Sequence, residues 1–233
     1  MKGFLVTTRP QEKFKPVLIK TCFEVKNMPL TRVVPRADFD PESLTDYNAD
    51  VYVVTSSVGA ELLMRALPPD SLKSKKLVAI GRKTSETLNR FGVSAEVPHF
   101  HNSDGIAEII LRKYSDRKIA LVRSSMGTPE LNRVLSENRI TFRDFQIYDV
   151  VRNETNMSIL SDSNLIGILL TSRYEAAIIL DHAERTGIRL KNLFAIGSTT
   201  KKFIESRGYS VSGEVPNSDF EDAIRIIAGI ICR

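Results

Sequence analysis

Two pairs of hydroxyl-bearing residues follow apolar runs in this sequence, and residues of this type at these positions could bind a ligand. Thr55-Ser56 comes directly after "VYVV", and Thr171-Ser172 comes directly after "LIGILL". Where a strand gives way to a helix, such side chains can cap the helix or help it bind an anion. Ser172 with Glu175 three residues later fits a capping box. At each position a structural cap and an anion contact both remain open.

A second motif, Ala-Ile-Gly followed by a threonine, occurs in "KLVAIGRKTSETLNRFG" and in "NLFAIGSTTKKFIESRG". Gly81 and Gly197 allow a tight turn and a close backbone approach. Thr84 and Thr200 lie where a helix should begin, and their hydroxyls could cap it. Several helix N-termini at one edge would suit a ligand rich in carboxylates or phosphates. Neither G-x-G-x-x-G nor G-x-x-x-x-G-K-[ST] occurs, so a nucleotide is weakly supported.

Other catalytic or metal-binding patterns are scarce. His99 and His101 in "PHFHNS" could share a strand face, but no third ligand is near in sequence, and a surface loop is the better interpretation. Cys22 and Cys232 form no ligand or redox pattern, so we expect reduced thiols in the cytoplasm. We predict no metal site.

The two Ala-Ile-Gly stretches belong to an internal repeat. A shift of 116 residues places Thr55-Ser56 on Thr171-Ser172, Gly81 on Gly197, Thr84 on Thr200 and Val34 on Val150, without a gap. Agreement over half of the chain predicts a tandem duplication of one unit.

Each repeat alternates apolar strand candidates with helix candidates. "GFLVTT", "DVYVVTS" and "KLVAIG" read as buried strands, and 103–114 and 218–231 read as one further helix per repeat. Ala60, Leu63, Met64 and Leu67 recur at helical spacing after the first Thr-Ser pair. This alternation predicts parallel sheets with helices on both faces, where ligands bind at the carboxyl ends of the strands.

Composition narrows the classes of function. The chain has 233 residues, of which 42% are apolar and 26% charged, and its net charge is +5. The basic residues are scattered and form no nucleic-acid motif, so we expect no nucleic-acid partner. No apolar run reaches the ~20 residues needed to cross a membrane, and the start has no signal-peptide core. We therefore expect a cytoplasmic protein without a membrane partner.

Several stretches together resemble the uroporphyrinogen-III synthase family. They are "VTTRP", "DVYVVTSSVGAELL", "AIGRKTSETLNRFG", "QIYDVV", "GILLTSRYEAAIIL" and "AIGSTTKKFIESRG", in the family's order and spacing over nearly the whole chain. "VRSSMGTPEL" departs from the family, which often has Arg-Gly there, and so does Lys201, where alanine is common. The loop around Ser124 is therefore in doubt.

The resemblance implies an α/β fold of two similar flavodoxin-like parallel-sheet domains joined by a two-stranded β hinge. Domain one would comprise 1–34 plus 153–233, and domain two 37–148. The connecting strands would be 29–36 and 146–153, whose β-branched alternation agrees with that role. Motion of the domains around a cleft is then expected.

The resemblance also implies a cofactor-free reaction of a cyclising hydro-lyase in haem biosynthesis. Linear hydroxymethylbilane would lose water and close to uroporphyrinogen III with its terminal pyrrole ring inverted. The implied partners are this substrate and hydroxymethylbilane synthase, which would hand it over; a monomer is expected. Such chemistry depends mainly on proximity and orientation, which agrees with the scarcity of catalytic motifs.

One catalytic residue follows from the resemblance. Tyr148 would assist departure of the hydroxyl through its phenolic O–H, from the strand face opposite Phe145 and Ile147. From the residues alone, a structural tyrosine is the better interpretation, and only the resemblance brings the catalytic role level with it. The implied substrate-binding residues are Arg9, Thr55, Ser56, Gly81, Thr84, Ser103, Arg123, Ser172, Gly197, Thr199 and Thr200. Arg9 and Arg123 could instead be surface ion-pair partners.

Two other classes remain open. A non-enzymatic two-domain sensor that closes on a small anionic ligand would bind the tetrapyrrole precursor without consuming it. A sugar-phosphate enzyme on a similar sheet would need a phosphate-binding motif that the sequence does not contain.

Overall fold

The computed structural model describes residues 3–216 and 220–232. The chain divides into two compact units. Unit 1 comprises Met1–Arg32 and Val151–Arg233, and unit 2 comprises Val33–Val150. Each unit contains a largely parallel sheet with helices on its faces, so the predicted α/β fold with parallel-sheet character is confirmed.

The sheet of unit 1 has the strand order β10-β9-β8-β1-β2, with parallel neighbours. The strands are β1 (Phe4–Thr7), β2 (Glu24–Asn27), β8 (Leu165–Leu170), β9 (Leu193–Ile196) and β10 (Val211–Val215). Because parallel neighbours end at the same edge, the residues after β1, β8 and β9 gather at one end of the sheet. The apolar side chains of β1, β8 and β9 are almost wholly buried, as expected where helices cover both faces.

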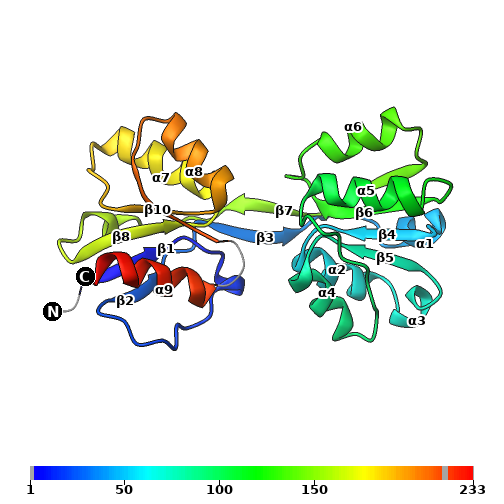
Figure 1. Ribbon diagram of the computed structural model, residues 1–233, viewed down its shortest axis with the longest axis horizontal. Helices are drawn as coiled ribbons and strands as arrows, with labels where there is room; N and C mark the ends of the chain where they lie inside the picture. Colours follow the sequence, from blue (N-terminus) through cyan, green and yellow to red (C-terminus); the bar gives the residue numbers. More distant parts are fainter. Residues whose placement is uncertain (1–2, 217–219, 233) are drawn as a thin grey trace. The chain divides into compact units, whose positions relative to one another are not determined.

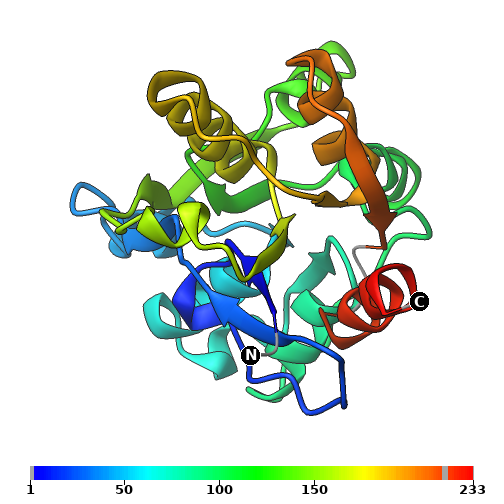
Figure 2. The same ribbon diagram turned by 90° about the vertical axis from the view of Figure 1, so that its left-hand side faces the viewer.

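Helices cover both faces of this sheet. α7 (Arg173–Thr186) and α8 (Gly197–Ser206) lie on one face, and α9 (Phe220–Ile231) lies on the other (Figures 1 and 2). One core packs α7 and α8 against β1 and β8, and a second packs α9 against Leu5, Phe194 and Val215. The 3-10 turns are η1 (Gln11–Lys13) and η2 (Ser158–Ser161). Positions 218 and 219 of the predicted last helix lie outside the described residues.

The sheet of unit 2 has the strand order β3-β7-β6-β4-β5. The strands are β3 (Thr31–Pro35), β4 (Val51–Val54), β5 (Lys76–Ala79), β6 (Ile119–Ser124) and β7 (Phe142–Arg152). β4, β5, β6 and β7 pair in parallel. β3 runs antiparallel to β7, since Arg36 N–H donates to the Ile147 carbonyl and Asn153 N–H donates to the Leu30 carbonyl.

The helices of unit 2 also lie on both faces (Figure 1). α2 (Ser57–Ala66) and α4 (Arg82–Asn89) share one core with Tyr148, and α5 (Ser103–Lys113) and α6 (Glu130–Glu137) share another. Short helices α1 (Glu42–Tyr47) and α3 (Pro69–Leu72) complete the unit. Ala60, Leu63, Met64 and Leu67 are all buried, which confirms the helical spacing read from the sequence.

Elements 116 residues apart occupy corresponding places in the two sheets. β4, β5, α2 and α4 of unit 2 correspond to β8, β9, α7 and α8 of unit 1, and the order β5-β4-β6-β7 matches β9-β8-β1-β2. The fifth strands, β3 and β10, lie at opposite edges of their sheets and have no such counterpart among the described strands. A duplicated unit would produce this correspondence. The main difference is α6, whose place in unit 1 is taken by an irregular segment, 14–22, where Pro16 disfavours a helix.

The two cysteines correct an expectation. Cys22 and Cys232 form a disulfide with sulfur atoms 2.04 Å apart, although the sequence predicted reduced thiols. Cys22 precedes β2 and Cys232 follows α9, so the bond joins the early and late parts of unit 1. Only the discontinuous fold of this unit brings together cysteines 210 positions apart.

No helix in the described ranges 3–216 and 220–232 is long and apolar enough to cross a membrane. Residues 99–102, which include both histidines of "PHFHNS", form an exposed loop, as predicted. The His99 ring packs edge-on against Phe100, with ring centroids 4.8 Å apart.

Candidate active site

The carboxyl edge of the unit 2 sheet holds a hydroxyl that caps a helix. Ser56 directly precedes α2, and its Oγ accepts a hydrogen bond from the Gly59 N–H at 2.8 Å. The neighbouring Thr55 is half-buried, and its N–H donates to the Val122 carbonyl at 3.3 Å. The cap that the Thr-Ser pattern predicted is therefore present, and one lone pair of Ser56 Oγ is occupied.

Tyr148 reaches this cap from β7. Its Oη lies 2.8 Å from Ser56 Oγ, and the residue is 5% exposed. The register of β7 shifts between the pairs Arg123–Gln146 and Ser124–Tyr148, so β7 carries an extra residue there. Such a bulge re-aims the side chains that follow it. Tyr148 therefore joins Phe145 in one core cluster, and the expectation that it faces away from Phe145 and Ile147 was wrong.

Either oxygen of the Tyr148–Ser56 pair could donate the hydrogen of this bond, and one of the two arrangements leaves the phenolic hydrogen available to a ligand. Ser56 Oγ already accepts from Gly59, and its own hydrogen can go to Tyr148 Oη. In that arrangement the phenolic hydrogen of Tyr148 is not used in the bond to Ser56, so it can be donated to a ligand. A tyrosine held this way can stabilise an oxygen that is acquiring negative charge.

Gly81 lies one strand away from Ser56. The register pairs Val54 with Ala79, so Ser56 and Gly81 follow at the same level, and neighbouring strands lie about 4.8 Å apart. Gly81 caps α4 without a side-chain hydrogen bond. A Cβ on Gly81 would lie 3.5 Å from the His101 ring, so the imidazole covers this turn.

Two further predicted residues of unit 2, Thr84 and Ser103, lie within helices and are not their caps. Thr84 lies inside α4 and is 4% exposed. The expectation that it caps the helix was wrong. Ser103 opens α5, but the cap is Asn102, whose Oδ1 accepts from Gly105 N–H at 3.0 Å. Asn102 directly before a helical pattern is a sequence signal for this cap that the prediction overlooked.

Arg123 is buried and turned into the unit 2 fold. Its guanidinium donates to both carboxylate oxygens of Asp144 at 2.8 and 2.6 Å and to the Thr128 carbonyl at 2.8 Å. Burial alone would raise the pKa of Asp144, but hydrogen bonds from Arg123 and Asn132 outweigh it and lower the pKa. A Cβ on Gly127 would lie 2.7 Å from Arg123 Nη1, so the loop needs this glycine. Arg123 is therefore engaged within unit 2.

That loop also differs from the expected start of α6. Thr128 followed by Pro129 is a common helix start, with the threonine as the cap and the proline as the first helical residue. In the structure Pro129 is the cap and α6 begins at Glu130, one residue later. Thr128 instead offers its carbonyl to Arg123.

The carboxyl edge of unit 1 holds a second capping serine. Ser172 Oγ accepts from the Glu175 N–H at 3.2 Å and caps α7. The Glu175 carboxylate, 3% exposed, binds threonines instead of completing a capping box. Its Oε2 accepts from the hydroxyls of Thr171 at 2.6 Å and Thr8 at 2.9 Å, and its Oε1 accepts from Thr31 at 3.2 Å. Burial raises the pKa of Glu175, although these hydrogen bonds oppose the rise.

The other predicted residues of unit 1 surround α8 and η1. Gly197 begins α8 with a φ of +71°, a conformation that favours glycine. Thr199 is exposed, whereas Thr200 lies within the helix, 4% exposed, and does not cap it as expected. The Arg9 guanidinium lies 4.6 Å from the centroid of the Phe220 ring.

The described residues contain no group of three or more His, Cys, Asp or Glu side chains that could hold a metal ion. Each edge offers hydroxyls and backbone N–H groups, and the unit 2 edge also has the Tyr148 phenol. Such a set suits binding of carboxylates and pyrrole nitrogens and assistance to a leaving oxygen.

Comparison with known proteins decides the family. The profile of the family described as "Uroporphyrinogen-III synthase HemD" matches residues 12–225. The chain belongs to the uroporphyrinogen-III synthase family. A protein of Archaeoglobus fulgidus, provisionally named a uroporphyrinogen-III synthase, is 25% identical over 215 residues, which is 88% of each chain. The resemblance read from the sequence is thus confirmed.

Solved structures of uroporphyrinogen-III synthases share the fold. A mutant enzyme from the extremely thermophilic bacterium Thermus thermophilus aligns with a TM-score of 0.65 at 13% identity and covers 99% of both chains. The enzyme from Helicobacter pylori aligns with a TM-score of 0.64 at 15% identity and covers 98% of this chain and 99% of its own. At these identities the match establishes the architecture.

Proposed function

We propose that this uroporphyrinogen-III synthase closes linear hydroxymethylbilane with loss of water and inversion of the terminal pyrrole ring. The family assignment supports this function in tetrapyrrole biosynthesis. It also makes the alternative, a non-enzymatic sensor of a small anion, the less favoured one. The observation that carries the chemical proposal is the Tyr148–Ser56 hydrogen bond at the carboxyl edge of unit 2.

Tyr148 has the role of assisting the leaving hydroxyl. When the C–O bond breaks, the electron pair goes to oxygen, and a phenolic O–H directed at that oxygen stabilises the charge. Ser56 holds Tyr148 Oη at 2.8 Å as a hydrogen-bond partner, and the bulge in β7 fixes the direction of the ring. The leaving oxygen takes up a proton beside Tyr148 Oη and departs as water. The substrate loses one proton when the attacked pyrrole ring regains aromaticity, so the protons balance.

The other predicted residues act mainly by binding. We propose that hydroxyls and backbone N–H groups at both carboxyl edges hold the acidic side chains and pyrrole rings of the substrate. The residues assigned to this role are Thr55, Ser56, Gly81, Thr84 and Ser103 in unit 2 and Arg9, Ser172, Gly197, Thr199 and Thr200 in unit 1. Thr84 and Thr200 are buried in the first turns of α4 and α8, so they contribute by packing beneath the helix starts. Arg123 is assigned to Asp144 and not to the substrate.

The domain organisation supports a hinge as part of this proposal. We assign domain one to 1–34 plus 153–233 and domain two to 37–148, with 29–36 and 146–153 as connecting strands. The division into compact units and the pairing of β3 with β7 support this assignment. Motion at these strands would admit a flexible substrate and release the product.

The cellular setting remains a prediction. A monomer in the cytoplasm that receives its substrate from hydroxymethylbilane synthase agrees with the proposed reaction. The disulfide argues against a reducing compartment, because cytoplasmic thiols are normally kept reduced.

The proposal is tested by supplying hydroxymethylbilane, generated by its synthase, to the purified protein. The products are oxidised and the uroporphyrin isomers separated by chromatography. Isomer III as the main product supports the proposal. Isomer I alone, which forms spontaneously, would refute it, and bilane that binds without being consumed would favour the sensor.

A further inference from the structure

The Glu175 carboxylate determines the direction of three threonine hydroxyls. It receives hydrogen bonds from Thr8, Thr31 and Thr171 hydroxyls and a fourth from the Thr171 N–H at 3.2 Å. Burial raises the pKa of Glu175, and at a pH above that raised value the carboxylate is ionised and can only accept, whereas a backbone N–H can only donate. The Thr31 and Thr171 hydroxyl hydrogens are therefore committed to Glu175, and the Thr8 hydrogen is shared between Glu175 and the Leu169 carbonyl at 3.4 Å. Each hydroxyl oxygen is left with lone pairs alone for any other partner.

One of these hydroxyls can meet a ligand. Thr8 is 0% exposed and Thr31 is 1% exposed, so both are enclosed in unit 1. Thr171 is half-buried and follows β8 at the carboxyl edge, directly before the capping residue Ser172. Thr171 Oγ1 is thus a hydroxyl oxygen at the binding edge that can accept a hydrogen bond but has no hydrogen to offer.

We propose that Thr171 Oγ1 accepts a hydrogen bond from a pyrrole N–H of the substrate, and that Glu175 is the positioning residue that makes it an acceptor. This inference rests on the proposed function, because a linear tetrapyrrole supplies pyrrole N–H donors. The same arrangement excludes carboxylates. An acetate or propionate oxygen placed against Thr171 Oγ1 would find lone pairs and no donor.

The corresponding position in unit 2 has no carboxylate to accept the threonine hydroxyl hydrogen. A shift of 116 residues places Thr171 on Thr55 and Glu175 on Gly59, which has no side chain to receive the Thr55 hydroxyl. Thr55 can therefore donate to a carboxylate. The two Thr-Ser edges, alike in sequence, are predicted to recognise different groups of the substrate: a pyrrole nitrogen in unit 1 and an acidic side chain in unit 2.

Four single variants separate the acceptor role from packing. Thr171→Val removes the oxygen at constant shape, and Thr171→Ser keeps it. Glu175→Met removes the carboxylate and keeps a side chain of similar length. In Glu175→Gln the amide oxygen should take the Oε2 position, because the Thr171 N–H at that position can only donate. Thr31→Val is the matched control, because Thr31 is enclosed and bonds Oε1, the other oxygen.

The measurements are KM for hydroxymethylbilane, kcat and thermal stability of each full-length variant. We expect Thr171→Val and Glu175→Met to raise KM about three- to tenfold, the range for one neutral hydrogen bond, with kcat nearly unchanged. Thr171→Ser and Glu175→Gln should keep KM near that of the wild type. Thr31→Val should lower stability and leave KM unchanged.

Three results would overturn the inference. They are an unchanged KM in Thr171→Val, an unchanged KM in folded Glu175→Met, and an equal rise of KM in Thr31→Val, which would indicate packing. Failure of the proposed function looks different, because the wild-type protein itself would then produce only isomer I.

Discussion

Replacing Tyr148 by phenylalanine removes one oxygen from the candidate active site and little else. The ring stays packed in its core cluster, and the structural loss is the 2.8 Å hydrogen bond to Ser56. A neutral hydrogen bond contributes about 0.5–1.5 kcal/mol to stability. Ser56 keeps its capping bond to Gly59. A domain with about 5 kcal/mol of stability would then still be more than about 99% folded.

The effect on turnover should be much larger than the effect on folding. Proton donation by a positioned side chain typically contributes about 10²–10⁴ in rate. We expect kcat of Tyr148→Phe to fall at least about a hundredfold, which corresponds to about 2.7 kcal/mol in the barrier. The assay is the initial rate of isomer III formation at saturating bilane, with circular dichroism to confirm folding.

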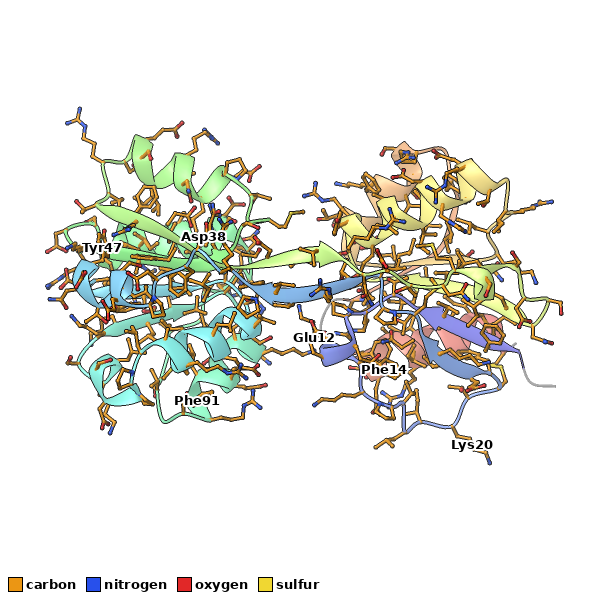
Figure 3. The ribbon with its side chains drawn as sticks, turned by 180° about the vertical axis from the view of Figure 1, so that it is seen from behind. Glu12, Phe14, Lys20, Asp38, Tyr47 and Phe91 are labelled. Atoms are coloured by element: carbon orange, nitrogen blue, oxygen red, sulfur yellow. A yellow bond between two sulfur atoms is a disulfide. The ribbon has the colours of Figure 1, made fainter. Side chains whose placement is uncertain are left out.

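Tyr47 in α1 offers a matched control in the same unit (Figure 3). Its buried hydroxyl has no hydrogen-bond partner among the described residues, and its ring packs edge-on against Phe145 at 5.5 Å. Tyr47→Phe should leave turnover unchanged and stability equal or higher. Wild-type turnover in Tyr148→Phe would remove its proposed role, and an equal loss in both variants would point to the core instead of the chemistry.

Three further predictions concern stability. Reduction of the disulfide, or a double serine replacement of Cys22 and Cys232, should each lower the free energy of unfolding by about 2–4 kcal/mol in urea titrations; two free thiols in denatured, unreduced protein would contradict the bond. Asp144→Asn breaks a buried ion pair with Arg123, whose side chain is 6% exposed, and should cost about 3–5 kcal/mol. The lowered pKa of Asp144 means that its contribution is present at neutral pH and is lost as the pH falls through that lowered value; equal stability of wild type and variant at pH 7 would argue against it. For Glu175 the change of stability with pH has the opposite sign, because its raised pKa lets the folded state hold a proton that the unfolded chain releases. Relative to Glu175→Gln, the wild type should therefore lose stability as the pH rises from about 4.5 through the raised value, and a flat difference would contradict the assignment.

Short-range patterns predicted the strand ends and the caps that depend on them. Ser56 and Ser172 cap α2 and α7, as a serine between an apolar run and a helical pattern should. These features depend on residues three positions apart, which the sequence shows directly. The capping box failed in part, because the carboxylate of Glu175 is buried among threonines from other strands.

Contacts between distant segments were beyond such reasoning. Arg123 carries a charge that could equally bind a ligand, and its partner Asp144 comes from the neighbouring strand. The direction of Tyr148 depends on one extra residue in β7, which an alternating pattern does not reveal. The disulfide requires a unit built from both ends of the chain. In each case tertiary pairing decides the outcome, and local sequence does not encode it.

The central claim is that this chain directs ring closure to the inverted isomer. The most direct test is the initial rate of uroporphyrinogen III formation from hydroxymethylbilane as a function of protein concentration, with heat-denatured protein as the background. The account predicts a rate proportional to the native protein and a product dominated by isomer III. A rate and isomer ratio equal to the denatured background, with isomer I prevailing, would contradict it.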